Sequence, residues 1–283
     1  MAEKFFKLGI IGWPLGYSLS PKMHTVALQA AGLKGEYKEY KVKPEELENW
    51  LKTEAPKLDG FNVTMPHKEV VYRWIKEHGE IHNPTVLDAI GAVNTVKVTG
   101  TKLIGYNTDG RGFFDSLPKN LDLKGGRVLL LGAGGAAQAV AVWLAIVVQV
   151  ASLKIWNRNK DRAERLALKL ESLATPCRPS VSEIGTVDFS RIDLIVNATP
   201  LGMKAEGEVP QELLGHLAKR HVVFDLVYEP EETGLLRAGK QVGCSTIGGK
   251  EMLASQGVEA FEIWVEERFN PETLRSVMRK AIE

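Results

Sequence analysis

The stretch that decides the fold is Arg127-Val128-Leu129-Leu130-Leu131-Gly132-Ala133-Gly134-Gly135-Ala136-Ala137. Its apolar run breaks into glycines and then enters an alanine-rich segment, which predicts a strand, a tight turn and a helix. Gly132, Gly134 and Ala137 fit G-x-G-x-x-G/A, a pattern that lets backbone approach a pyrophosphate at the start of a helix. The stretch therefore favours a dinucleotide site, although a plain turn can carry the same glycines.

Composition narrows the class of protein. A chain of 283 residues suggests about two domains, enough for one cofactor and one substrate. With 44% hydrophobic residues, 25% charged residues and a formal net charge of +1, the chain has no general attraction for nucleic acid or an anionic membrane. We therefore expect small-molecule partners.

The cysteines and the most apolar segments of the sequence indicate which cellular compartment to expect. Cys177 and Cys244 have no zinc spacing and no third ligand nearby, so we expect free thiols, no metal site and a reducing cytoplasm. Residues 1–7 lack the apolar core of a signal sequence. The most hydrophobic window, residues 139–153, is too short to span a bilayer and is expected to be a buried helix and the start of a strand.

Strands and helices alternate along the chain. In the first half, strands are expected at 8–12, 37–42, 91–98 and 102–110, with helices at 22–31 and 44–51. The stretch 58–68 is expected to be a strand that ends in polar residues and runs through Pro66 into a helix at 69–76. After a boundary region at 110–126, helices are expected at 136–148, 160–173, 252–269 and 271–282, with strands at 127–131, 152–156, 192–200 and 222–228. This order predicts an α/β fold with a doubly wound parallel sheet.

Polar residues collect where the strands of the first half end. They are Ser18, Ser20, Asn62, Thr64, Lys68, Asn94 and Asp109. Reducing a ketone by hydride transfer leaves an alkoxide that must be protonated, and a lysine held by an aspartate is a suitable donor. Lys68 and Asp109 are the candidates. Each also has a plain interpretation: Lys68 as a solvated first-turn residue, Asp109 as a turn residue and Ser20 as a helix cap with Pro21 at the first helical position.

A second set of polar residues follows the expected strand at 152–156. Asn157 and Arg158 stand where an NAD site would have an acid, and a cation there suits the 2′-phosphate of NADP. Arg158 and Arg162 could instead be the solvated start of a helix. His67 is interpreted as structural or exposed, and Tyr228 and Gln256 have equally plain structural interpretations.

Taken together, these segments resemble the shikimate dehydrogenase family over nearly the whole chain. The resemblance rests on Ser18-Leu19-Ser20-Pro21 with His24, the segments 62–68, 91–95 and 105–109, the glycine turn at 132–137, Asn157-Arg158, and the segments 197–203, 225–228 and 252–257. It implies two α/β domains: a substrate domain at 1–112 on which helices at 250–283 pack back, and a Rossmann-like NADP-binding domain at 113–249.

The resemblance also implies a reaction and a set of site residues. The reaction is the reversible NADPH-dependent reduction of 3-dehydroshikimate to shikimate, on the route to chorismate and the aromatic amino acids, with Lys68 and Asp109 as the catalytic pair. The implied substrate residues are Ser18, Ser20, Asn62, Thr64, Lys68, Asn94, Asp109, Tyr228 and Gln256. The implied cofactor residues are Gly132, Ala133, Gly134, Gly135, Ala136, Asn157, Arg158 and Arg162, with Thr199, Met203, Leu226 and Gly249 near the nicotinamide.

This sequence departs from the family pattern at four places. Tyr17 and Thr25 replace the usual His and Asn beside the substrate loop, and Gly248 replaces a common Asp. The join at 147–151 lacks its usual glycine. Two alternatives stay open: a quinate/shikimate dehydrogenase with broader substrate and cofactor use, and a protein that senses shikimate or NADP without turnover. A monomer or a homodimer is expected.

Overall fold

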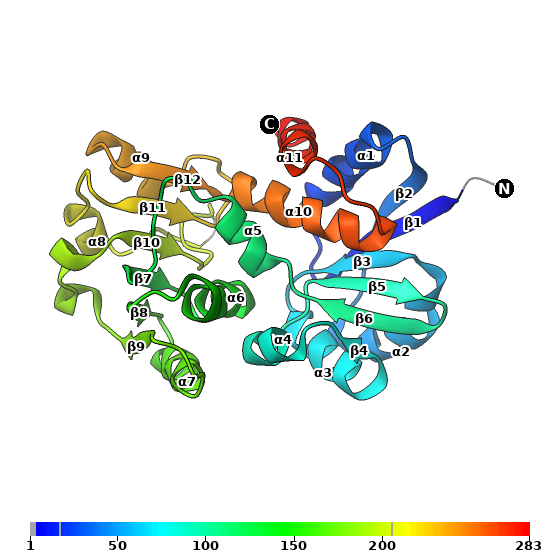
Figure 1. Ribbon diagram of the computed structural model, residues 1–283, viewed down its shortest axis with the longest axis horizontal. Helices are drawn as coiled ribbons and strands as arrows, with labels where there is room; N and C mark the ends of the chain where they lie inside the picture. The colour runs from blue at the N-terminus through cyan, green and yellow to red at the C-terminus, as the bar shows by residue number, and fades with distance from the viewer. Residues whose placement is uncertain (1–3, 17, 205) are drawn as a thin grey trace. The chain divides into compact units, whose positions relative to one another are not determined.

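The computed structural model describes residues 4–16, 18–204 and 206–283. The chain divides into two compact units (Figure 1). The first comprises Met1–Gly112 and Leu253–Glu283, and the second is Phe113–Met252. The first unit is therefore discontinuous in sequence, and its C-terminal part returns after the second unit is complete.

The first unit is built on a mixed sheet whose strand order is β2-β1-β3-β5-β6-β4. Its strands are β1 (Phe5–Gly12), β2 (Lys34–Lys41), β3 (Gly60–Val63), β4 (Glu80–Ile81), β5 (Thr95–Thr99) and β6 (Lys102–Tyr106). β1 pairs in parallel with β2 and β3, whereas β5 is antiparallel to β3 and β6. The expected hairpin at 91–110 is thus β5 and β6, with a loop at 91–94 before it.

Helices of the first unit pack on this sheet and on one another. They are α1 (Ser20–Ala30), α2 (Leu47–Thr53), α3 (Lys68–His78), α4 (Pro84–Ile90) and α11 (Pro271–Ala281), with short 3₁₀ turns η1 (Pro44–Glu46) and η2 (Ala55–Lys57). α1 contacts β1, β2 and α11, and α3 contacts β4 and β6. The expected helix at 44–51 is therefore η1 followed by α2.

The helix α10 (Gly249–Val265) completes the core of the first unit through Trp264. The Trp264 side chain is 1% exposed, and its Nε1 donates to the Val96 carbonyl oxygen at 2.9 Å. A Cβ at Gly60 would lie 2.1 Å from the Trp264 ring, so only glycine fits on β3 beneath it. The remaining core of this sheet includes Ile11, Phe61, Val63, Val71, Ile75, Val93 and Val96.

The second unit holds the doubly wound sheet. Its strands are β7 (Arg127–Leu131), β8 (Ser152–Trp156), β9 (Arg178–Val181), β10 (Leu194–Asn197), β11 (Val222–Asp225) and β12 (Ser245–Gly248). They lie in the order β12-β11-β10-β7-β8-β9, and every pairing is parallel. Connections run from β7 outward in both directions, so the switch point lies between β7 and β10, where such sheets bind ligands.

Helices of the second unit follow its strands. They are α6 (Gly135–Trp143), α7 (Lys160–Glu171), α8 (Gln211–Gly215) and α9 (Gly234–Gln241), and α5 (Asp109–Asp115) spans the join between the units. The core of this unit includes Leu129, Leu131, Ile195, Val223, Leu235 and Leu236. Among the described residues, no helix is both long and apolar enough to cross a membrane.

Some local expectations differ from the structure. Ser20 does not cap its helix: Leu19 is the N-cap, and the Ser18 Oγ accepts from the Ser20 backbone N–H at 3.2 Å. β4 and the helix α4 fall in a stretch for which no element was expected. β4 has only two residues, which give no readable alternation. The long helix expected at 252–269 begins and ends earlier, at Gly249 and Val265.

The join after α6 lacks the glycine that is usual in the family pattern, and another residue takes the left-handed conformation there. α6 runs into a π-helical turn, Leu144–Val148, and Gln149 then takes the left-handed conformation with φ 61°. The Gln149 carbonyl oxygen accepts from the Gly125 N–H at 3.0 Å, which fixes the turn. A side chain in this conformation is strained, because Cβ approaches the following carbonyl oxygen.

Replacing Gln149 with glycine should therefore stabilise the protein. We expect Gln149→Gly to raise the free energy of unfolding by about 1 kcal/mol, because glycine adopts positive φ without that cost. Chemical denaturation of the two proteins measures the difference. Gln149→Ala is the matched control: it keeps the Cβ and should give no gain, and an equal gain from both variants would contradict the explanation.

Candidate active site

Lys68 is the first residue of α3, and the turn before it is firmly held. The His67 N–H donates to the Thr64 carbonyl oxygen at 3.0 Å, and the His67 Nε2 lies 2.7 Å from the Val42 carbonyl oxygen. Burial lowers the pKa of His67, so its ring is neutral near neutral pH and acts as a structural link. The Lys68 carbonyl oxygen accepts from the Val93 N–H at 2.9 Å, which ties this helix start to the loop before β5.

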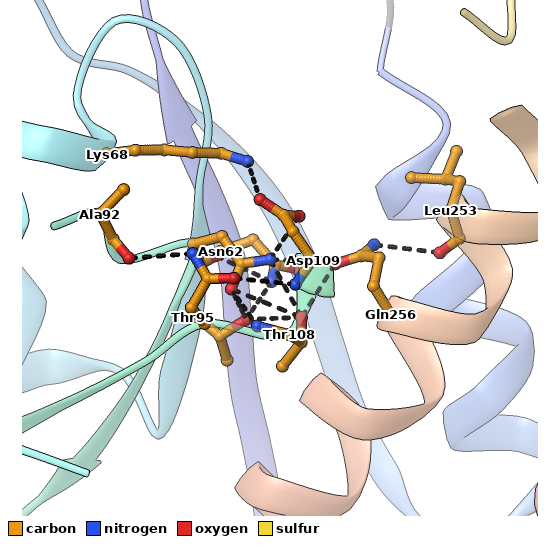
Figure 2. Close-up of polar contacts among 10 residues, drawn as sticks. Asn62, Lys68, Ala92, Thr95, Thr108, Asp109, Leu253 and Gln256 are labelled. Atoms are coloured by element: carbon orange, nitrogen blue, oxygen red, sulfur yellow. Dashed lines mark hydrogen bonds and ion pairs between the residues drawn. The ribbon is translucent and has the colours of Figure 1, made fainter. Parts of the chain in front are cut away.

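The structure brings Lys68 and Asp109 together. The Lys68 Nζ donates to the Asp109 Oδ2 at 2.6 Å, as Figure 2 shows. Their side chains are 18% and 8% exposed, so this pair is mostly shielded from water. An ammonium has three N–H donors, and the carboxylate occupies one of them. The pair can therefore hold the lysine in place and still present a proton to a bound oxygen.

Asn94 holds the carboxylate of this pair. Its Nδ2 donates to the Asp109 Oδ1 at 2.7 Å and to the Thr108 Oγ1 at 3.0 Å. Its Oδ1 accepts from the Thr108 backbone N–H at 2.8 Å and from the Thr95 Oγ1 at 3.0 Å. The Asp109 N–H in turn donates to the Asn107 Oδ1 at 3.0 Å. The Asp109 side chain is therefore fixed from several sides.

Gln256 joins the same network from α10. The Thr108 Oγ1 donates to the Gln256 Oε1 at 3.2 Å, and the Gln256 Nε2 donates to the Leu253 carbonyl oxygen at 3.0 Å (Figure 2). This approach depends on Gly112, where a Cβ would lie 2.5 Å from the Gln256 Cβ and 2.7 Å from its backbone nitrogen. Gly112 thus allows α10 to reach the strand-end residues.

Asn62 lies at the same sheet, on β3. Its Nδ2 donates to the Asn94 carbonyl oxygen at 3.2 Å and to the Thr95 Oγ1 at 3.1 Å. Its Oδ1 accepts from the Tyr37 hydroxyl at 2.7 Å. Both N–H donors of the amide are therefore used within the protein, and only the oxygen keeps a further lone pair for a ligand.

Ser18, Ser20 and Thr64 are the remaining expected substrate residues of the first unit. Ser20 is buried, Ser18 and Thr64 are half-buried, and the Thr64 N–H donates to the Ile11 carbonyl oxygen at 2.9 Å. Tyr17 lies outside the described residues. Tyr228 belongs to the second unit, after β11, where burial raises the pKa of its hydroxyl.

The glycine turn after β7 has the geometry that a pyrophosphate needs. Gly132 has φ 118°, and a Cβ there would lie 2.8 Å from the Ala198 carbonyl oxygen, so a side chain is excluded. Gly134 is the N-cap of α6, and a Cβ there would meet nothing within 4 Å. Space is therefore open above the helix start, while Ala137 is fully buried against the sheet. These residues fit a dinucleotide phosphate.

The residues after β8 carry positive charge at an exposed position. Arg158 is 64% exposed and lies 3.8 Å from the Glu206 carboxylate, a distance that gives a weak ion pair. The Asn159 Oδ1 accepts from the Arg162 N–H at 3.1 Å and caps α7, and the Asn157 Nδ2 donates to the Asn159 carbonyl oxygen at 2.7 Å. This cap therefore supports the interpretation of Arg162 as a residue at the start of a helix.

The expected nicotinamide residues follow the other strands of the same sheet. Thr199 and Met203 follow β10, Leu226 follows β11 and Gly249 follows β12. A Cβ at Gly249 would lie 2.2 Å from the Leu226 carbonyl oxygen, so this pair requires glycine. Gly248 has more room, since its Cβ would make ordinary contacts at 3.6 Å and 3.7 Å. Crowding does not explain why Gly248 replaces the usual acid.

Three further residues support the candidate site and are not among those predicted from the sequence. Thr108 links Asn94 to Gln256, Asn107 holds the Asp109 backbone and donates to the Ala92 carbonyl oxygen, and Tyr37 orients Asn62. Thr108 and Asn107 directly precede Asp109, and that position was a usable signal. Tyr37 gave none, because its role depends on the strand that lies beside it.

His24 is buried without a hydrogen bond. Its side chain is 0% exposed, its ring stacks on Tyr37 at 4.6 Å, and neither ring nitrogen finds a partner within the described chain. Trp264 lies on another side at 5.0 Å. Burial lowers the pKa of His24 to about 3, against a smaller opposite effect from the Asn62 side chain. The ring is therefore neutral at physiological pH.

The sequence of this chain is similar to those of known proteins. The family model for the shikimate dehydrogenase substrate binding domain matches residues 10–96. The shikimate dehydrogenase (NADP(+)) of Symbiobacterium thermophilum is 41% identical over 283 residues, which cover 98% of this chain and 94% of the relative. The chain belongs to the shikimate dehydrogenase family. The members of this family are oxidoreductases.

Solved structures of dehydrogenases are similar to this chain in fold. The shikimate 5-dehydrogenase of Thermus thermophilus in complex with NADP(H) and shikimate matches with a TM-score of 0.83 and 32% identity, covering 98% of this chain and 99% of that one. A quinate dehydrogenase from Corynebacterium glutamicum in complex with NAD matches with a TM-score of 0.82 and 30% identity, covering 97% of this chain and 99% of that one. The shikimate dehydrogenase fold, with its substrate domain and Rossmann-like domain, is therefore established here.

The neutral, buried His24 should make stability depend on pH. The ring takes up a proton at pH 6.5 when unfolded and at about 3 when folded, so stability is fully present above 6.5 and falls as the pH drops between these values. We expect His24→Phe, which keeps the stack on Tyr37, to reduce this slope by about 1 kcal/mol per pH unit.

Denaturation at several pH values measures this slope. His67 and His221, whose pKa values burial also lowers, remain in the variant and keep a smaller slope. An unchanged slope in His24→Phe would show that the buried imidazole is not the group responsible.

Proposed function

We propose that this protein is an NADP-dependent shikimate dehydrogenase that reversibly reduces 3-dehydroshikimate to shikimate. The observation that carries the proposal is the Lys68–Asp109 ion pair at 2.6 Å, which Asn94 holds among polar side chains at the strand ends of the first unit. The relative from Symbiobacterium thermophilum and the Thermus thermophilus structure support the same reaction.

Lys68 and Asp109 act as the catalytic pair in this proposal. NADPH supplies the hydride when bound. The Lys68 Nζ donates a proton to the oxygen that gains negative charge, and in the reverse direction it takes the proton back. Asp109 keeps the ammonium in position, because its carboxylate is itself fixed by Asn94. Residues 1–112 and 250–283 form the proposed substrate domain.

Small polar side chains in this domain bind the substrate. Ser18, Ser20 and Thr64 offer hydroxyls, and Asn62 and Gln256 offer amide groups, which suit a carboxylate and several hydroxyls. Asn94 belongs to the same proposed set, and its amide also holds Asp109. Tyr228, a residue of the second unit, is also among the substrate residues that the resemblance implies. The Asn62 amide contributes through its oxygen, because the Asn94 carbonyl oxygen and Thr95 take its N–H donors.

Residues 113–249 form the proposed NADP domain. The backbone at residues 132–136 binds the pyrophosphate, since Gly134 leaves open space at the start of α6. Asn157, Arg158 and Arg162 bind the 2′-phosphate end, where the exposed guanidinium of Arg158 is available to pair with phosphate. Thr199, Met203, Leu226 and Gly249 lie at the nicotinamide end.

Quinate turnover is a second candidate, favoured by the similarity to the quinate dehydrogenase of Corynebacterium glutamicum. A plate assay of nicotinamide absorbance separates the candidates by crossing shikimate and quinate with NADP and NAD. Turnover largely confined to shikimate with NADP supports the main proposal. Substantial quinate turnover with NAD supports the second. Shikimate binding without turnover in any well would indicate a sensor.

Removing the proton donor should abolish most turnover. We expect Lys68→Ala to lower kcat by about 10²- to 10⁴-fold with little change in shikimate affinity, because the hydroxyl contacts remain. Steady-state kinetics and calorimetric titration measure the two effects. Lys76→Ala is the matched control, since Lys76 lies on the same helix α3 and its removal breaks an exposed ion pair with Asp88 of α4. Unchanged turnover in Lys68→Ala would refute the catalytic role.

Removing Arg158 should change cofactor preference. We expect Arg158→Ala to weaken NADP binding by about tenfold or more and to leave NAD binding nearly unchanged, because only NADP carries the 2′-phosphate. Titration with each cofactor measures the ratio. Arg165→Ala, which removes an exposed arginine of the following helix α7, serves as the control. Equal losses for both cofactors would contradict the phosphate role.

A further inference from the structure

Asp225 is a buried carboxylate that the proposed chemistry leaves unused. It is the last residue of β11 and is 0% exposed. Its Oδ1 accepts from the Asn197 Nδ2 at 2.9 Å and from the Val227 N–H at 3.0 Å, and its Oδ2 accepts from the Thr233 hydroxyl at 2.6 Å. Three segments of the second unit therefore converge on this one side chain.

Asn197 passes this constraint to the turn after β10. Because an ionised carboxylate only accepts hydrogen bonds, Asp225 forces the Asn197 Nδ2 toward itself and the Oδ1 away. The Nδ2 also donates to the Leu201 carbonyl oxygen at 2.8 Å. The Oδ1 accepts from the Thr199 N–H at 3.1 Å and its hydroxyl at 2.6 Å. The amide is thus fully engaged, and it fixes both sides of the turn.

Thr199 and Leu201 close the turn between them. The Thr199 hydroxyl gives its proton to the Asn197 Oδ1, and its Oγ1 accepts from the Leu201 N–H at 3.2 Å. The orientation of the Thr199 side chain therefore follows from that of Asn197. The chain continues to Met203, whose N–H donates to the Pro200 carbonyl oxygen at 3.0 Å.

The Thr233 side of the carboxylate supports the far end of the same turn. Thr233 is the N-cap of α9, and its Oγ1 accepts from the Leu236 N–H at 3.3 Å. Gly202 has φ 102°, and a Cβ there would lie 3.2 Å from the Thr233 methyl group. Residue 202 therefore packs closely on a side chain that Asp225 holds.

We infer that Asp225 is a positioning residue for the nicotinamide end of the cofactor site, which acts by setting Asn197 and through it the turn from Thr199 to Met203. The inference rests on the proposed function, in which Thr199 and Met203 lie near the nicotinamide. It adds a residue that touches neither substrate nor cofactor but determines the shape of the backbone that does.

The choice of a carboxylate here supports a functional role over a purely structural one. Burial raises the pKa of Asp225 to about 6, with a smaller contribution from Glu208, and its hydrogen bonds from Thr233, Val227 and Asn197 oppose this rise. A raised carboxyl pKa means that ionised Asp225 destabilises the folded state above pH 6. An asparagine would avoid this cost, but it could not accept from all three donors at once.

The test compares Asp225→Ala and Asp225→Asn in the full chain. We expect Asp225→Ala to lower kcat with shikimate and NADP⁺ by about 10- to 100-fold, because a small displacement at the reacting end of a cofactor has effects of this size. Asp225→Asn keeps an oxygen that can accept from Asn197 and Val227, but it has no second oxygen to accept from Thr233. The decrease in kcat should therefore be smaller in Asp225→Asn than in Asp225→Ala. The melting temperature of Asp225→Asn at neutral pH should not fall.

Two binding probes separate positioning from general damage. Adenosine 2′,5′-bisphosphate reports on the phosphate end around Arg158, and shikimate reports on the proposed substrate residues, all of which except Tyr228 belong to the first unit. Both affinities should stay within about twofold of the parent protein in each variant, since neither site uses the turn. Asp188→Asn is the matched control, because that exposed carboxylate accepts from Ser190 within the same unit.

Each outcome decides a separate question. A selective loss of kcat with both probe affinities kept supports the inference. Unchanged kcat in Asp225→Ala, or parallel losses of kcat, probe binding and melting temperature, would overturn it. If the parent protein itself neither binds the bisphosphate nor turns over shikimate with NADP⁺, the proposed function fails, and the inference fails with it.

Discussion

The candidate site depends on the hydrogen bonds of the Asn94 side-chain amide. One group contacts the Asp109 carboxylate, the Thr108 backbone and the Thr95 hydroxyl, so it joins the loop before β5 to the start of α5. An amide that is engaged at both ends has one orientation, because reversing it would leave buried donors and acceptors unpaired. Lys68 finds Asp109 in a fixed place for this reason.

The second unit uses the same arrangement. Asn197 donates to the Asp225 carboxylate as Asn94 donates to the Asp109 carboxylate, at 2.9 Å and 2.7 Å. In both cases an acceptor-only group determines which way a neighbouring amide points, and the amide then holds a backbone turn beside a proposed ligand. The difference lies in the partners: Asp109 meets a lysine, whereas the partners of Asp225 are neutral donors.

Much of this could be predicted from the sequence because parallel strands end at a common edge. The apolar run 127–131 predicted β7, and the strand expected at 222–228 is β11 over its first four residues. The polar residues that follow such runs predicted Lys68 and Asp109 as a pair. Residues whose role depends on a spatial neighbour were not predictable. Tyr37 matters because β2 and β3 flank the same strand, and Gln149 takes a left-handed conformation that its residue type disfavours.

The route of the chain through the two units sets an order for its synthesis. All strands of the second unit have been made when residue 253 leaves the ribosome, so that unit can fold while translation continues. The first unit cannot. Trp264, which fills the space above Gly60, and Gln256, which reaches Thr108, arrive only with the last segment. The nascent chain therefore holds a nearly complete sheet β1–β6 with an uncovered core until its final helices emerge.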